Sequence, residues 1–208
     1  MKFYYCKGSA SFAPHVVLFC TGAEFEAVHI SVKDGSTRSP EFLKINPKGR
    51  IPVLDTGTDV LTESAAILYF LGLRYPEAGL VPDSPMGVAR TVEWTNWLST
   101  IHAANLAQRT RPERFTDDES AFNGIRTKGV ANLHEMFGQI DDRLEGRDWA
   151  VGDAMSVADV HILQFFKWGN MLGLEMEPFA HWTAHTRRME QQDAVQKVLE
   201  VEGSSLWK

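Results

Sequence analysis

The strand-like patterns in this 208-residue chain are confined to its first third, and every later segment has the periodicity of a helix. Strands are predicted at 2–6, 27–32, 51–54 and 60–62, with helices at 12–21, 40–43 and 63–75. Helices alone are predicted at 86–107, 119–144, 156–172, 178–191 and 194–201. This order predicts an α/β domain of thioredoxin-like topology, followed by an all-α domain.

A proline-rich stretch separates these two regions. Pro76, Pro82 and Pro85 fall within ten residues, where the helical pattern is interrupted. We therefore predict a thioredoxin-like domain over residues 1–77, a linker over 78–85 and an all-helical domain over 86–208.

The composition excludes several classes of function. The net charge is −6, with no run of basic residues, so we expect neither a nucleic-acid partner nor a membrane partner. The first residues lack the apolar core of a signal peptide, and the only cysteines are Cys6 and Cys20. We expect reduced thiols, a cytoplasmic location and no bound metal.

Three groups of motifs then resemble one known family. Residues 46–54 and 61–67 are similar to the glutathione-site core of the cytosolic glutathione S-transferases. Residues 4–18 resemble the opening of the bacterial beta class, and residues 151–159 resemble the capping motif of the family's second domain. The resemblance covers nearly the whole chain. It implies the transferase fold, glutathione as co-substrate, a small electrophile as second substrate and a homodimer.

The resemblance also implies how glutathione is held. Ile51-Pro52 is expected to be a cis peptide whose backbone pairs with the cysteinyl part of glutathione. Glu63 and Ser64 fall at a strand-to-helix junction, where free N–H groups form an anion site. Ser64 is expected to bind the γ-glutamyl carboxylate, and Glu63 the nearby ammonium group.

Two further binding residues are implied outside this core. Lys33 follows the second strand and is either a ligand of the glycyl carboxylate or a solvated surface lysine. Asn96 matches an asparagine that reaches glutathione from the neighbouring subunit.

The chain departs from the beta class at the position of its reactive cysteine, which here is Ala10. A hydroxyl group can instead donate a hydrogen bond to the glutathione thiolate. We expect Ser11 to do so, with Ser9 second and Tyr5 as a weaker candidate; the alternative for both serines is a turn and a helix cap.

A second departure concerns a histidine. The active-site histidine of beta-class relatives aligns with Ala103, and His102 lies one residue earlier. Because one residue turns a helix by about 100°, we expect His102 on a polar face away from the site.

The function that follows is transfer of the glutathione thiolate to a small apolar electrophile. A glutathione-dependent reductase, lyase or isomerase is the first alternative, and the missing cysteine weakens the reductase. A binding protein without catalysis is the second, because a fold does not fix a function. Some of the aromatic residues of the second domain are expected to line the electrophile pocket: Trp94, Trp97, Phe115, Phe165, Phe166 and Trp168.

Overall fold

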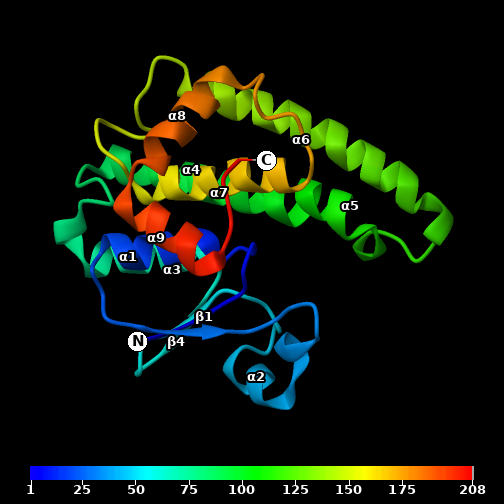
Figure 1. Cartoon of the computed structure of the whole chain (residues 1–208), viewed down its shortest axis with the longest axis horizontal. Coiled ribbons are helices and arrows are strands. Elements are labelled where there is room, and N and C mark those ends of the chain that lie inside the picture. Colours follow the sequence, from blue (N-terminus) through cyan, green and yellow to red (C-terminus); the bar gives the residue numbers. More distant parts are fainter. Residues whose placement is uncertain (208) are drawn as a thin grey trace.

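A four-stranded mixed sheet forms the base of the first domain in the computed structural model, which describes residues 1–207 (Figure 1). The strands are β1 (Lys2–Tyr5), β2 (Glu26–His29), β3 (Val53–Asp55) and β4 (Val60–Thr62), in the spatial order β2-β1-β3-β4. β1 runs parallel to β2 and antiparallel to β3, and β3 is antiparallel to β4. The predicted thioredoxin-like topology is confirmed.

Helices cover both faces of this sheet. α1 (Phe12–Cys20) and α3 (Ser64–Arg74) lie between the sheet and the helical region, whereas α2 (Pro40–Ile45) lies on the opposite side (Figure 1). Alternate β1 residues Phe3 and Tyr5 are buried, as the period of a strand requires. They pack in one core with Val16, Val17 and Leu68 from the two covering helices.

The second strand is shorter than predicted. β2 ends at His29 instead of residue 32 because its only neighbour, β1, ends at Tyr5. The last backbone bond here joins the Ile30 N–H to the Tyr5 carbonyl at 2.8 Å. Val32 is 47% exposed in the loop beyond, which contains the short 3-10 helix η1 (Ser36–Arg38).

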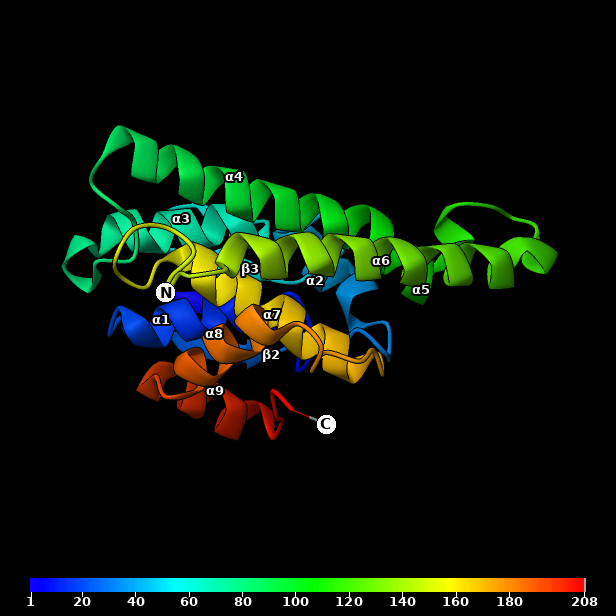
Figure 2. The same ribbon diagram turned by 90° about the horizontal axis from the view of Figure 1, so that it is seen from above.

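The rest of the chain is helical, as predicted. Its helices are α4 (Pro85–Ile101), α5 (Ala107–Thr110), α6 (Phe122–Leu144), α7 (Val157–Met171), α8 (Ala180–Glu190) and α9 (Asp193–Glu202). Short 3-10 helices lie at Pro76–Ala78 (η2), Pro112–Arg114 (η4) and Glu119–Ala121 (η5). Figure 2 shows α4 along one edge of the molecule and α7 between α6 and α1. Within residues 1–207 no helix has the length and apolar character needed to cross a bilayer.

One predicted helix is divided. The segment 86–107 contains α4 and then a π-helical turn, η3 (His102–Leu106), before α5 begins. A π turn inserts one residue into an α-helix, so the side chains beyond it are displaced around the axis. The hydrophobic pattern remains helical on both sides of the insertion, and this is why the interruption was not predicted.

α7 joins the two halves of the molecule. Val160 and Leu163 pack into the core of the sheet, whereas Ile162, Phe165 and Phe166 pack into the helical core. Such a helix is buried on all sides, and its first turn has no water to satisfy its backbone groups.

The capping motif at the start of α7 supplies these hydrogen bonds. Asp159 Oδ2 accepts from the Ser156 N–H at 2.8 Å and from Ser156 Oγ at 2.9 Å. Asp159 Oδ1 accepts from the Ala150 N–H at 2.7 Å and is bonded to His185 Nε2 at 2.8 Å. Both side chains of the capping box are present, as predicted.

Two other histidines are buried without a full set of partners. His15 and His161 are 1% and 2% exposed, and the Nδ1 atom of each lacks a hydrogen-bond partner among residues 1–207. Burial lowers the pKa of His15 to about 4. Burial, reinforced by the charge of His102, lowers the pKa of His161 to about 3.

The stability of the protein is therefore expected to fall as the pH drops from about 6.5 towards 4. Both pKa values are lower in the folded chain than in the unfolded chain, so the unfolded state binds more protons in this window. Between about pH 6 and 5 the two residues together cost roughly 2–3 kcal/mol of unfolding free energy. Urea unfolding at each pH measures this slope. His161→Gln should reduce it, and the exposed His181→Gln should leave it unchanged. Equal stability at both pH values would refute the assignment.

Candidate functional site

The start of α3 is an uncapped helix N-terminus. Helices α2, α4 and α7 begin at Ser39, Ser84 and Ser156, whose hydroxyls each accept a hydrogen bond from the first turn. α3 begins at Glu63, whose side chain makes no such bond, as is also true at the starts of α1, α5, α6, α8 and α9. Glu63 also has φ of 74°, a left-handed conformation that is unfavourable for a residue with a side chain and is often found at functional sites. The first turn of α3 therefore has donors available for an anion.

Residues 46–50 shape the backbone opposite this helix end. Asn46 is 1% exposed, and its Nδ2 donates to the Arg50 carbonyl at 2.7 Å. Its Oδ1 accepts from the Lys48 N–H at 3.1 Å. These bonds fix the turn immediately before Ile51-Pro52, the peptide bond that is cis as predicted. Lys48 then bonds Thr62 Oγ1 at 2.7 Å and forms a salt bridge with Glu63.

The loop between β1 and α1 meets α3 at Ser64. Ser64 Oγ donates to the Ala10 carbonyl at 2.8 Å. This contact places the position of the missing cysteine next to the predicted γ-glutamyl site. Ser9 and Ala10 are both partly exposed in this loop.

The two candidate serines occupy different environments. Ser11 is 0% exposed, and its Oγ donates to the Cys6 carbonyl at 3.0 Å and accepts from the Cys6 N–H at 3.2 Å. Ser9 is partly exposed; its Oγ accepts from the Ser11 N–H at 3.2 Å and lies 2.9 Å from Ser11 Oγ. Both hydroxyls are thus bonded within the loop, and Ser9 is the one of the two that is open to solvent.

The loop is also held by the helical domain. The Gly8 N–H donates to Glu202 Oε2 at 3.1 Å, and Trp168 Nε1 donates to the Gly8 carbonyl at 3.0 Å. Gly8 has φ of 70°. Behind it, the side chains of Lys167 and Glu202 form an ion pair at 3.7 Å and are 2% and 0% exposed. Burial raises the pKa of Glu202 and lowers that of Lys167.

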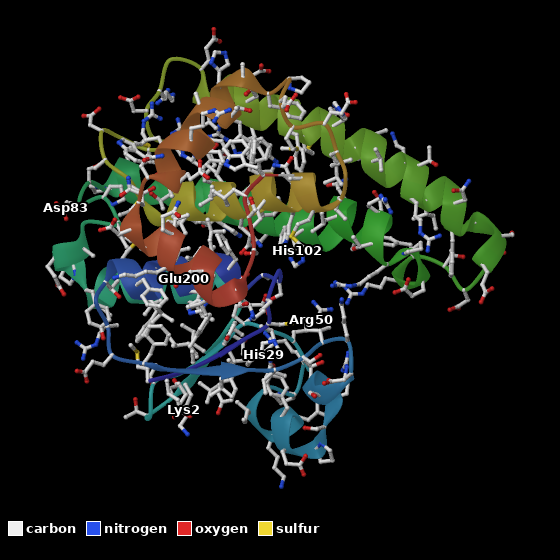
Figure 3. All side chains as sticks on the ribbon, viewed as in Figure 1. Lys2, His29, Arg50, Asp83, His102 and Glu200 are labelled. Atoms are coloured by element: carbon white, nitrogen blue, oxygen red, sulfur yellow. The ribbon has the colours of Figure 1, made fainter. Side chains whose placement is uncertain are left out.

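His102 faces the first domain. Its ring lies 4.9 Å from the Trp168 ring, and Figure 3 shows it on the side of the helical domain that faces Arg50. Ala103 is exposed. His102 is therefore partly buried against Trp168 and does not lie on an outward polar face. Burial, reinforced by Arg111, Arg114 and Arg50, lowers the pKa of His102 to about 4.

The remaining candidates lie apart from this loop. Lys33 is exposed beyond β2, and Asn96 is exposed on α4. Tyr5 is 8% exposed and packs against the rings of Phe3, His15 and His29; burial raises its pKa. Of the six aromatic residues from which some were expected to line the pocket, three belong to the core, at 0–1% exposed: Trp94, Phe165 and Phe166. No group of acidic, histidine or cysteine side chains suited to a metal occurs within residues 1–207.

The fold and this site define a protein of the glutathione S-transferase class. The family model described as "Glutathione S-transferase, N-terminal domain" matches residues 1–72, and the corresponding C-terminal model matches residues 126–193. Protein LigF of Sphingobium sp. is 36% identical over 185 residues, which cover 74% of this chain and 72% of LigF. The chain belongs to the cytosolic glutathione S-transferase family.

Another relative matches this chain over almost its full length, and a further one is named as an isomerase. Glutathione S-transferase GstA of Escherichia coli O157:H7 is 28% identical over 98% of this chain and 99% of its own. Maleylacetoacetate isomerase of Pseudomonas aeruginosa is 28% identical over 78% of both chains.

Solved structures give the same family. A glutathione S-transferase from Xylella fastidiosa has a TM-score of 0.90 at 26% identity, covering 98% of this chain and 99% of that one. A sphingomonad glutathione S-transferase complexed with glutathione has a TM-score of 0.82 at 29% identity, covering 99% and 100%. Glutathione is therefore the ligand with which neighbours of this fold have been solved.

Four residues that shape the site were not given these contacts by sequence reasoning. Asn46 and Lys48 lie in the segment 46–54 that was expected to form the glutathione-site core, but neither was assigned a role of its own, and Trp168 was considered only as an aromatic residue of the pocket. Trp168 and Glu202 act on Gly8 from 160 and 194 residues away. No local pattern predicts such long-range contacts.

Proposed function

We propose that this protein is a glutathione S-transferase that joins the glutathione thiolate to a small electrophile. The uncapped start of α3 at Glu63 and Ser64 is the observation that supports this most strongly. Its free donors suit the γ-glutamyl carboxylate, and Ser64 adds a hydroxyl that is now bonded to Ala10. Glu63, Ile51 and Pro52 complete the proposed cradle, with Lys33 at the glycyl end and the partner's Asn96 at the subunit boundary.

We propose Ser9 ahead of Ser11 as the donor to the thiolate, which reverses the order expected from the sequence. Ser9 is partly exposed, and its hydroxyl would exchange its bond with Ser11 Oγ for one to a bound thiol, so we propose it as the donor to the thiolate. Ser11 is fully buried and bonded to both backbone groups of Cys6, so we propose it as a positioning residue that holds the loop.

Ser64→Ala is expected to weaken glutathione binding about tenfold or more, because a hydrogen bond to a charged group is lost. Calorimetric titration with glutathione measures this. Ser84→Ala is the matched control: it also removes a serine at a helix start, on α4, and should leave glutathione affinity unchanged. Unchanged affinity in Ser64→Ala would refute the cradle.

A titration with glutathione followed by the ultraviolet absorbance of the thiolate tests the thiolate donor. Ser9→Ala should bind glutathione but show less thiolate absorbance near neutral pH, because the thiol pKa rises without its donor. Full thiolate absorbance in Ser9→Ala would remove Ser9 from this role.

A glutathione-dependent isomerase is the second candidate, and it is favoured by the similarity to maleylacetoacetate isomerase. Both reactions need a glutathione thiolate, but an isomerase regenerates glutathione and a transferase consumes it. Measuring free thiol during turnover separates them. A reductase that forms a mixed disulfide at the beta-class cysteine position is disfavoured, because this position is Ala10.

We further propose that the protein is a cytoplasmic homodimer. Within each chain, we propose that residues 78–85 link the two domains. Large apolar side chains are exposed on the neighbouring segments β4, α3 and α4: Val60, Leu73, Met86 and Val92, at 40–67%. A second copy covering this surface would bury them and bring Asn96 of α4 towards the partner. Sedimentation that finds only monomer at micromolar concentration would contradict the dimer.

A further inference from the structure

Four arginines gather beside the proposed glutathione site, from both domains. Arg50 directly precedes Ile51, and Arg38 ends η1. The Arg38 side chain packs against Gly49, the residue before Arg50, since a Cβ added at Gly49 would lie 3.0 Å from Arg38 Cδ and Nη1. From the helical domain, Arg111 follows α5 and Arg114 ends η4.

Three of these charges act on Arg114, the fourth, and three act on His102. Partial burial, and then the charges of Arg111, Arg50 and Arg38, lower the pKa of Arg114. Arg111, Arg114 and Arg50 also lower the pKa of His102, and Figure 3 shows Arg50 and His102 on facing sides of the domain boundary. The group is therefore one region of positive potential that crosses this boundary.

No acidic side chain of residues 1–207 forms a salt bridge with any of the four. Glu63 is already paired with Lys48. The chain as a whole carries a net charge of −6, so this concentration of cations does not follow from general basicity. Glu113 beside Arg114 raises the pKa of that arginine but offsets only part of the positive charge, so an anion bound between the arginines would relieve their repulsion.

Aromatic surface lies beside the same charges. Phe115 directly follows Arg114 and is 44% exposed. The Trp168 ring stacks with His102, whose imidazole is neutral at physiological pH because its pKa is about 4. An aromatic plane together with guanidinium groups suits a flat molecule that bears a carboxylate.

We infer that the electrophile of this protein is an aromatic compound carrying a carboxylate, bound by Arg111 and Arg114 with support from Arg50 and Arg38. This inference rests on the proposed transferase function. It assigns a charged class of second substrate in place of the small apolar compound expected from the sequence.

Two electrophiles that differ by one carboxylate provide the test. The first is the chlorodinitrobenzene with both nitro groups ortho to chlorine, and the second is the same compound with a carboxylate para to chlorine. In both, the glutathione sulfur bonds to the carbon that bears chlorine, and chloride leaves with the bonding electron pair. We expect kcat/KM, divided by each uncatalysed rate, to favour the benzoate by about tenfold, and this preference to fall as salt is added.

The Arg111→Gln/Arg114→Gln variant should lower this preference about tenfold, and Arg147→Gln, an exposed arginine remote from the group, should preserve it. Equal efficiency for both electrophiles in the unmodified protein would overturn the inference. So would an Arg111→Gln/Arg114→Gln variant that raises the KM for glutathione equally with both electrophiles, since the arginines would then serve glutathione itself.

A binding measurement separates this inference from the proposed function. Dinitrobenzoate and dinitrobenzene, which have no leaving chloride, are titrated against tryptophan fluorescence in the presence of glutathione. Tighter binding of the benzoate, lost in the double variant, supports the anion site even if neither chlorinated compound is conjugated. Absence of conjugation would count against the transferase function, whereas absence of a binding preference would overturn the anion site.

Discussion

Asp159→Ala is expected to lower the free energy of unfolding by about 3–5 kcal/mol, one of the two largest effects of a single substitution that we predict. The carboxylate accepts hydrogen bonds from the backbone of Ala150 and Ser156, from the Ser156 hydroxyl and at His185. Its side chain is 0% exposed, so water cannot replace it. Truncation leaves at least two buried backbone donors and an imidazole nitrogen without partners.

Chemical unfolding followed by circular dichroism and tryptophan fluorescence measures this loss, and coincidence of the two probes tests for a single transition. Ser156→Ala removes the two contacts of the hydroxyl, with the Ala158 N–H and with Asp159 Oδ2, but keeps the carboxylate, and it should cost about 1–2 kcal/mol. Asp153→Ala is the matched control, since Asp153 is exposed in the same loop and should shift stability by less than about 0.5 kcal/mol. An Asp159→Ala protein as stable as Asp153→Ala would show that the cap is dispensable.

The site should respond differently from the fold. Asp159 touches none of the groups proposed to hold glutathione, so the folded fraction of Asp159→Ala should retain its glutathione affinity. α7 nevertheless supplies Trp168 and Lys167 to the loop at Gly8. Both residues lie at the end of α7 opposite to the cap, so we expect a loosened start of the helix to affect the site only through global unfolding. This separates Asp159→Ala from Ser64→Ala, which acts on the site directly.

Much of the fold could be predicted because its signals are local. Alternation in β1, the hairpin of β3 and β4, and helical spacing after residue 62 each occupy a short window of sequence, and the sheet topology follows from their order. The errors lie where tertiary structure overrides a local pattern. β2 ends early because β1 offers no further partner, and the π turn at His102 leaves no mark in the hydrophobic period.

The site likewise contains features that could be predicted from local motifs and features that depend on distant residues. The cis bond at Ile51-Pro52 and the helix start at Ser64 lie within motifs, so they could be identified from neighbouring residues. The direction of the Ser11 hydroxyl could not, because it depends on the backbone of Cys6 at the end of β1. The clamp on Gly8, formed by its hydrogen bonds with Glu202 and Trp168, is still more distant from any motif, since Glu202 is on the last helix.

That clamp gives the second large effect. Glu202→Ala is expected to cost about 3–5 kcal/mol, because it leaves the Lys167 ammonium buried without its acid partner. The two side chains are 2% and 0% exposed, and the ammonium otherwise lies 5.0 Å from the Phe12 ring and 3.9 Å from Met171 Sδ, neither of which replaces a carboxylate. The Gly8 N–H also loses its acceptor. Urea unfolding measures the loss, and glutathione titration reports whether the loop at Ser9 is still in place.

The paired variant Lys167→Met/Glu202→Gln distinguishes the charge from the clamp. Methionine removes the buried cation, and the glutamine carbonyl can still accept from Gly8, so most of the stability lost in Glu202→Ala should return, to within about 1–2 kcal/mol of the unmodified protein. Glutathione affinity should return with it, because the hydrogen bond that fixes Gly8 is restored. If stability returns but affinity does not, the ion pair itself sets the position of the loop. If neither returns, these two residues do not act as a pair, and α9 holds the first domain mainly through its apolar contacts with α1.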